Sequence, residues 1–169
     1  HWGITRKECD VFGKLSQDRA ARAWQEDRYG TQMVNVEAPV LDDEGSPTGE
    51  TETVIKDEGL RETTMEGLAQ LKPSGRPDGV HTAASSSQIS DGAGAVLLMT
   101  ADKAAALGVE PLARVVDTCL VGSDPEFMLT GPIGATRKLL ADNGMAIEDI
   151  DVVEINEAFA SVVLCWEKE

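Results

Sequence analysis

An asparagine near the end of the chain has the surroundings that a carboxamide needs to do chemistry. Residues 151–155 have the β-branched composition of a short buried strand, and Asn156 follows them directly. Beyond it, Phe159, Val162 and Trp166 recur at helical spacing, so the pattern predicts a strand, a polar corner and a helix that starts at Asn156. Open α/β sheets bind ligands at such strand ends. The amide can either cap this helix or donate two hydrogens into a cleft, and the local pattern leaves both open.

A second stretch of interest is a run of small polar residues at positions 82–91, which includes Ser85, Ser86 and Ser87. It grades into the apolar residues 92–99. Small side chains allow a backbone to approach closely, so the serines suit contact with a bound, chain-like ligand. A serine-rich turn that leads into a core strand explains the same residues equally well.

The three cysteines, Cys9, Cys119 and Cys165, lie far apart, form no CxxC pair and have no histidine close in sequence. This spacing argues against a zinc site and against a disulfide framework. Each lies in a helical or strand pattern, so we expect reduced, buried, structural thiols rather than a catalytic nucleophile.

The charge of the chain excludes one class of partner. With 30 acidic and 15 basic residues, the net charge is −15, which repels nucleic-acid phosphates. No apolar run approaches the length of a membrane span, and the amino terminus lacks the apolar region of a signal peptide. We therefore expect a cytoplasmic protein that binds neither nucleic acid nor membrane.

The first half of the chain predicts helices and a hairpin. A capping box at residues 5–8 precedes a helical pattern at 9–24, and a second box at 63–66 opens a short helix. Between them, residues 33–40 and 51–56 have strand patterns that flank an acidic turn.

The second half alternates strand and helix patterns, which indicates parallel pairing with helices on the faces of a sheet. The predicted strands are residues 92–99, 112–121 and 151–155, and the predicted helices are 101–107, closed by Gly108, and 133–143, closed by Gly144.

The segment Asn156-Glu157-Ala158-Phe159 resembles the NEAF segment of the thiolases, and other parts of the chain resemble that family in the same order. They are residues 3–6, 16–21, 57–61, 71–73, 87–93 and 130–132, so the resemblance covers essentially the whole chain. It implies an α/β, thiolase-like αβαβα layered fold, incomplete here, with a loop-rich covering region.

The resemblance also implies a division of the chain. Residues 1–81 would be part of the loop domain that covers coenzyme A. Residues 82–110 would hold the last strand and helix of the amino-terminal thiolase half, and residues 111–169 the first part of the carboxyl-terminal half.

The resemblance assigns roles to five residues. Asn156 matches the catalytic asparagine whose amide holds a water that polarises the thioester oxygen. Ser87 matches a serine that contacts the pantetheine arm, and Met128 and Phe159 match apolar residues that line the thioester pocket. Arg61 corresponds to an arginine near the adenine. Coenzyme A and acyl-CoA would be substrates, with no tightly bound cofactor and no metal, and the complete protein would be a homodimer or homotetramer.

The chain departs from the family pattern in ways that matter for activity. Ala84-Ser85 replaces the usual Gly-Asn, Leu129 stands where many members have Gly, and Gly134 where many have Pro. The nucleophilic cysteine, the Gly-His-Pro segment and the second catalytic cysteine have no counterpart here. We therefore expect an internal fragment of a thiolase that is inactive alone. The parent would transfer acyl groups between 3-oxoacyl-CoA or acetyl-CoA and coenzyme A, in fatty acid metabolism and lipid degradation.

Two other functions stay open. One is a non-catalytic acyl-CoA or lipid-binding relative that kept the pocket and lost the chemistry. The other is a ketosynthase-like condensing enzyme with the same fold. An upstream cysteine and a downstream Gly-His-Pro would favour the thiolase over the first. The NEAF segment and the long loop region are thiolase features and disfavour the second, which transfer from acyl carrier protein without free coenzyme A would support.

Overall fold

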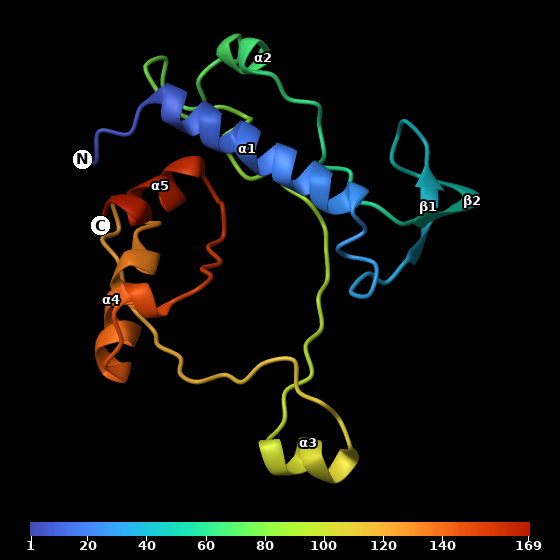
Figure 1. The fold of residues 1–169 in the computed structure, drawn as a ribbon. Coiled ribbons are helices and arrows are strands. Elements are labelled where there is room, and N and C mark those ends of the chain that lie inside the picture. The colour runs from blue at the N-terminus through green and yellow to red at the C-terminus, as the bar shows by residue number, and fades with distance from the viewer. The chain divides into compact units, whose positions relative to one another are not determined.

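The computed structural model describes all 169 residues, which divide into two compact units. The amino-terminal unit comprises Thr5–Ser86, and the carboxyl-terminal unit comprises His1–Ile4 together with Ser87–Glu169. Figure 1 labels the helices and strands of each unit. No helix in the structure combines the length and the apolar composition that crossing a lipid bilayer would require.

The amino-terminal unit is built on helix α1, Arg6–Gln25. Its first turn forms the predicted capping box, because Thr5 Oγ1 accepts from the Glu8 amide at 3.2 Å while Glu8 Oε2 accepts from the Thr5 amide at 2.6 Å. These bonds satisfy amide groups that have no partner within the helix. The prediction of a helix here is confirmed.

The predicted hairpin is also confirmed. Strand β1, Val36–Leu41, pairs antiparallel with β2, Pro47–Val54, in a register that places Val36 opposite Val54. The turn is held by Asp42, whose Oδ1 accepts from the amides of Glu44 at 3.0 Å and Ser46 at 2.8 Å. Such an Asx interaction replaces backbone pairing where the chain reverses.

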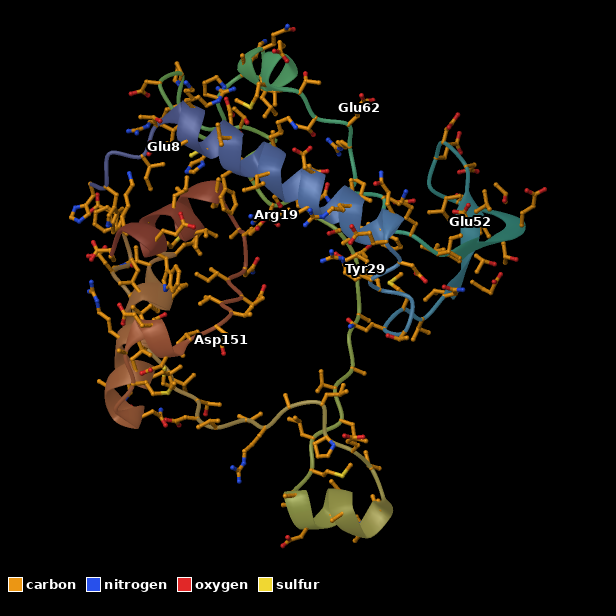
Figure 2. The ribbon with its side chains drawn as sticks, in the orientation of Figure 1. Glu8, Arg19, Tyr29, Glu52, Glu62 and Asp151 are labelled. Atoms are coloured by element: carbon orange, nitrogen blue, oxygen red, sulfur yellow. The ribbon has the colours of Figure 1, made fainter.

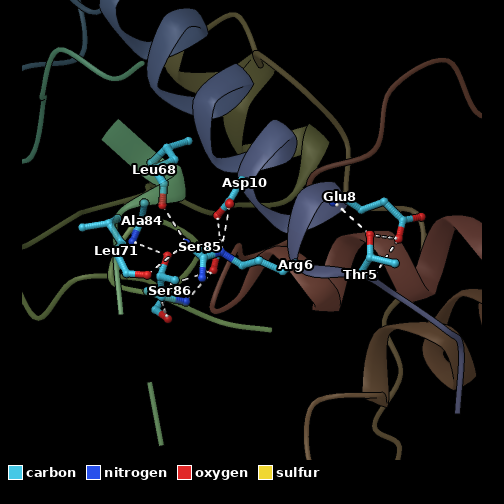
Figure 3. Close-up of polar contacts among 10 residues, drawn as sticks. Thr5, Arg6, Glu8, Asp10, Leu68, Leu71, Ala84, Ser85 and Ser86 are labelled. Atoms are coloured by element: carbon cyan, nitrogen blue, oxygen red, sulfur yellow. Dashed lines mark hydrogen bonds and ion pairs between the residues drawn. The ribbon is translucent and has the colours of Figure 1, made fainter. Parts of the chain in front are cut away.

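An ion pair on α1 holds the short helix α2, Met65–Ala69. Arg6 Nε lies 2.8 Å from the Asp10 carboxylate, and Arg6 Nη2 donates to the carbonyl oxygens of Leu68 at 2.6 Å and Leu71 at 3.2 Å (Figure 3). The guanidinium therefore supplies donors to one carbonyl in the last turn of α2 and to another just beyond its end. Helix α2 begins one residue later than the predicted box, with Thr64 as its N-cap.

The serine-rich stretch forms a turn that packs on α1. Thr82 and Ser85 are buried, the Thr82 amide donates to Ser85 Oγ at 2.9 Å, and Ser86 Oγ donates to the Thr82 carbonyl at 2.7 Å. A Cβ atom at Gly13 of α1 would lie 2.5 Å from the Ala84 carbonyl oxygen, which is too close for any side chain. Glycine is therefore required at position 13 for α1 to approach this turn.

The carboxyl-terminal unit contains α3 (Ala101–Leu107), α4 (Gly131–Asn143), a short 3₁₀ turn (Ile147–Asp149) and α5 (Ala160–Lys168). Helices α3 and α4 end at Gly108 and Gly144, with φ of 67° and 62°. This left-handed conformation suits glycine because it has no Cβ. Both predicted helix ends are confirmed.

The three strands predicted in this half are not formed. Residues 92–99, 112–121 and 151–155 join no sheet, and the structure's one sheet is the β1–β2 hairpin. Their apolar side chains are exposed, for example Val96 at 85% and Val152 at 84%. The amides and carbonyls of a strand must pair with an adjacent strand. An apolar composition favours burial but does not provide that adjacent strand. The prediction of parallel strand pairing is therefore wrong for these residues in this structure.

Side chains of α4 contact α5 and the residue that follows it, Glu169. Trp166 Nε1 donates to Thr136 Oγ1 at 2.9 Å, and Arg137 Nη2 lies 2.7 Å from Glu169 Oε2. The other oxygen of Glu169 accepts from Trp2 Nε1 at 2.8 Å. These bonds, with buried apolar residues of α5 such as Val162, fix the helix that follows Asn156.

Candidate functional site

Asn156 is exposed and lies outside the helix that follows it. Helix α5 begins at Ala160 with Phe159 as its N-cap, and no side chain caps it. The predicted helix start at Asn156 is thus wrong by four residues, and so is the N-cap interpretation of this asparagine. The error arises because the apolar spacing of α5 extends backward through Phe159, whose backbone is extended. The amide is left available for another partner.

A backbone hydrogen bond brings Ser87 beside the asparagine segment. The Ser87 amide donates to the Ala158 carbonyl at 2.9 Å. Ala158 lies between Asn156 and Phe159 along the chain, so three predicted site residues come from two segments that pair. Ser87 is exposed and Phe159 is half-buried. This grouping offers an amide, a hydroxyl and an apolar ring on neighbouring backbone.

The segment that leads to Asn156 has no regular secondary structure and starts at Asp151, which is labelled in Figure 2. This stretch of the carboxyl-terminal unit pairs with no strand. The predicted order of strand, polar corner and helix is therefore only partly correct, because α5 is formed but residues 151–155 make no strand.

Met128 lies in a different loop of the same unit. Its side chain is 64% exposed and its φ is 60°. The hydrogen bonds of its backbone run within the loop, to Ser123 and Asp124. Next to it, Phe127 packs against His1 and Trp2 with ring centroids 5.4 Å apart in both pairs. Nothing in the sequence pattern predicted this aromatic cluster, because Phe127 lies more than 120 residues from His1 and Trp2.

Arg61 belongs to the amino-terminal unit. Its backbone amide donates to Gln17 Oε1 of α1 at 3.0 Å, and the residue is exposed. The loop that carries the arginine is therefore held on α1.

Two of the three cysteines are buried, as predicted. Cys9 is 0% exposed and Cys165 is 5% exposed, and burial raises the pKa of both thiols. Cys119 is half-buried, and its sulfur donates to the Ala135 carbonyl at 3.7 Å. The thiolate is the reactive form, so a raised pKa together with burial makes Cys9 and Cys165 poor nucleophiles.

We expect iodoacetamide at mildly alkaline pH to alkylate Cys119 of the folded chain about tenfold faster than Cys9 or Cys165. Mass spectrometry of peptides from a time course measures the three rates. The control is the same reaction in concentrated urea, where the three rates should converge. Equal rates in the folded chain would contradict the burial of Cys9 and Cys165.

Family comparisons match nearly the whole chain. Residues 1–102 match the thiolase N-terminal domain and residues 109–169 match the thiolase C-terminal domain. The chain is 46% identical over 165 residues to a 3-ketoacyl-CoA thiolase of Saccharophagus degradans, covering 96% of this chain and 40% of that protein. It is 44% identical over 169 residues to a human peroxisomal 3-ketoacyl-CoA thiolase, covering 99% and 39%.

Solved structures give the same result. The acetyl-CoA acetyltransferase of Bacillus anthracis matches with a TM-score of 0.90 at 37% identity, over 98% of this chain and 40% of that one. Human mitochondrial 3-ketoacyl-CoA thiolase matches with a TM-score of 0.86 at 35% identity, again over 98% and 40%. The chain thus spans about 40% of the length of the relatives that it matches. By sequence and by fold, it belongs to the thiolase family.

Proposed function

We propose that this chain is part of a thiolase that transfers acyl groups between 3-oxoacyl-CoA or acetyl-CoA and coenzyme A. The observation that carries the proposal is the state of Asn156, which is exposed and takes no part in capping α5. The family membership and the names of the relatives, 3-ketoacyl-CoA thiolase and acetyl-CoA acetyltransferase, support the reaction class.

In this proposal Asn156 acts on developing negative charge. Its amide hydrogens hold a water against the thioester oxygen while an enolate forms. A donor fixed in advance at that oxygen stabilises the transition state more than the ground state. Ser87, paired with Ala158 through its backbone, contacts the pantetheine arm, and the half-buried Phe159 lines the thioester pocket.

The remaining predicted roles belong to the same proposal. Met128 lines the thioester pocket, and the exposed residue Arg61 binds near the adenine of coenzyme A. Residues 1–81 form part of the covering loop domain, 82–110 complete the amino-terminal half, and 111–169 begin the carboxyl-terminal half. The complete enzyme is a cytoplasmic homodimer or homotetramer with the layered αβαβα fold.

The chemistry needs groups that this chain does not supply. An acyl-enzyme requires an activated nucleophile with a nearby base. Burial raises the pKa of Cys9 and of Cys165, so neither thiol suits that role. Cys119 donates to the Ala135 carbonyl, which is not a base that could activate it. We therefore propose that the 169-residue chain alone has no transferase activity and that it supplies the asparagine and part of the coenzyme A site.

The experiment compares the chain with the protein encoded by the complete open reading frame that contains it. Each is incubated with 3-oxoacyl-CoA and coenzyme A, and chromatography follows the shortened acyl-CoA and acetyl-CoA. We expect turnover by the complete protein and none by the chain alone. Binding of acyl-CoA by the complete protein without any turnover would contradict the proposal and favour a non-catalytic binding protein.

A further inference from the structure

The backbone of Met128 has a conformation that side chains other than glycine rarely adopt. Its φ is 60°, and Asp27 is the only other non-glycine residue with a positive φ. The Leu129 amide donates to the Phe127 carbonyl at 2.6 Å, so Met128 is the centre of a three-residue turn. A turn of this size with a positive central φ is the rare, strained form of the γ-turn. The loop therefore holds Met128 in a costly conformation.

The strain at Met128 is not offset by burial of its own side chain. Methionine is a flexible apolar residue that normally fills gaps in a core, yet here 64% of its surface is exposed. Strained residues persist only where their surroundings force the conformation, and they gather at functional sites. The loop therefore maintains the backbone conformation of Met128, and this conformation sets the direction in which the side chain leaves the backbone.

Ser123 and Asp124 supply the forces that hold this direction. Ser123 Oγ donates to the Met128 carbonyl at 2.7 Å, and the Met128 amide donates to the Asp124 carbonyl at 2.8 Å. The Asp124 carboxylate also accepts from the amides of Glu126 at 2.8 Å and Phe127 at 3.2 Å. Both backbone groups of Met128 are thus bonded to the same dipeptide, which lies four to five residues earlier.

The other side of the loop is anchored by Phe127. Its ring packs against Trp2, whose indole nitrogen donates to Glu169 at 2.8 Å. Glu169 is in turn paired with Arg137 of α4. On one side of Met128, the loop is therefore linked through Trp2 and Glu169 to α4 and the end of α5. On the other side, it is held by hydrogen bonds within the loop.

We infer that Ser123 and Asp124 are positioning residues that set acyl-chain specificity, by holding Met128 in a left-handed turn with its side chain directed at the acyl group. The inference rests on the proposed function, in which Met128 lines the thioester pocket that holds the acyl group. A methionine turned by a change of φ moves its thioether by several bond lengths, which alters the depth of a pocket without removing any catalytic group. Loss of either positioning residue is expected to change substrate preference and to leave the use of coenzyme A intact.

The test uses the complete enzyme and measures kcat/KM for a four-carbon and a long-chain 3-oxoacyl-CoA. Ser123→Ala and Asp124→Ala should each change the ratio of the two values by about tenfold, the effect expected of a reshaped apolar pocket. The KM for coenzyme A should stay within about twofold of the wild type, in keeping with that pocket effect. Ser123→Thr and Asp124→Asn keep the hydroxyl and the acceptor oxygen, so they should retain the wild-type ratio.

Two further variants separate this role from stability. Asp42→Ala removes a carboxylate with the same type of turn interaction in the β1–β2 hairpin, and it should leave the ratio unchanged. Met128→Gly adopts a positive φ without strain, so it should change the ratio without lowering the melting temperature.

An unchanged ratio in both alanine variants, or an equal change in Asp42→Ala, would overturn the inference. If the alanine variants fold poorly, Met128→Gly decides, because a lower melting temperature with an unchanged ratio would also overturn it. A wild-type enzyme with no thiolase activity would overturn the proposed function as well, whereas an active enzyme with an unmoved ratio would overturn this inference alone.

Discussion

Replacement of Asn156 by alanine is expected to lower kcat of the complete enzyme by about 10²–10³, the effect typical of removing one donor from an oxyanion site. The carboxamide is exposed and unused by α5, so its loss removes no structural bond at the helix start. The melting temperature should therefore stay close to that of the wild type. Steady-state kinetics of thiolysis, together with a thermal melt, measure both quantities.

The substitution should change kcat much more than KM. A donor whose hydrogen bond strengthens as negative charge develops stabilises the transition state and contributes little to substrate binding. Asn156→Asp should be impaired as well, because a carboxylate offers no donor and adds a negative charge beside an anionic oxygen.

Asn35→Ala is the matched control for Asn156, since it removes an exposed asparagine from the stretch that precedes β1. Its kcat should stay within about twofold of the wild type, as expected for a surface change away from the site. A fall in kcat for Asn156→Ala no larger than that of Asn35→Ala would remove Asn156 from the mechanism.

The second large effect concerns the stability of the amino-terminal unit. Arg6→Ala leaves the Asp10 carboxylate, whose side chain is 7% exposed, without its charged partner. Removing one member of a buried ion pair typically costs about 3–5 kcal/mol. The variant also deprives the Leu68 and Leu71 carbonyls of a donor. Urea unfolding followed by circular dichroism should show this loss in the free energy of unfolding.

Lys14→Ala provides the control within the same helix. Lys14 and Asp18 form an ion pair with the same i,i+4 spacing as Arg6 and Asp10, but their side chains are 33% and 54% exposed. Solvent screens such a pair, so its loss should cost less than about 1 kcal/mol. The double variant Arg6→Met with Asp10→Leu should recover most of the stability, because no charge is then left buried. If Arg6→Ala and Lys14→Ala lowered the free energy of unfolding equally, the burial of Asp10 would not make its ion pair more important for stability.

Helix ends and turns that depend only on residues close together in the chain could be predicted from the sequence. The capping box at Thr5, the hairpin around Asp42 and the glycine ends of α3 and α4 each depend on residues within a few positions, and all are present. The resemblance carried by the NEAF segment also predicted the family correctly.

Elements that depend on distant partners could not be predicted in this way. Residues 92–99 and 112–121 have strand composition, but composition does not provide the adjacent strand that pairing requires. The start of α5 was misjudged because helical spacing says little about where extended backbone gives way to helix. The pairing of Ser87 with Ala158 joins residues 71 positions apart, and only the fold reveals it.

The conformation of Met128 illustrates the same limit at a single residue. A positive φ is predicted from sequence where glycine or asparagine stands, and methionine gives no such signal. The serine and aspartate that hold it are ordinary loop residues by type. Their role follows from the bonds that they make to the backbone of Met128.

A crystal structure of the complete enzyme with a bound acyl-CoA would show whether Asn156 acts on the thioester. We expect Asn156 Nδ2 to lie within about 3.2 Å of a water that also contacts the thioester oxygen, the range of a normal hydrogen bond. An Asn156 amide that points away from the acyl group, with no water between it and the thioester, would rule out this role.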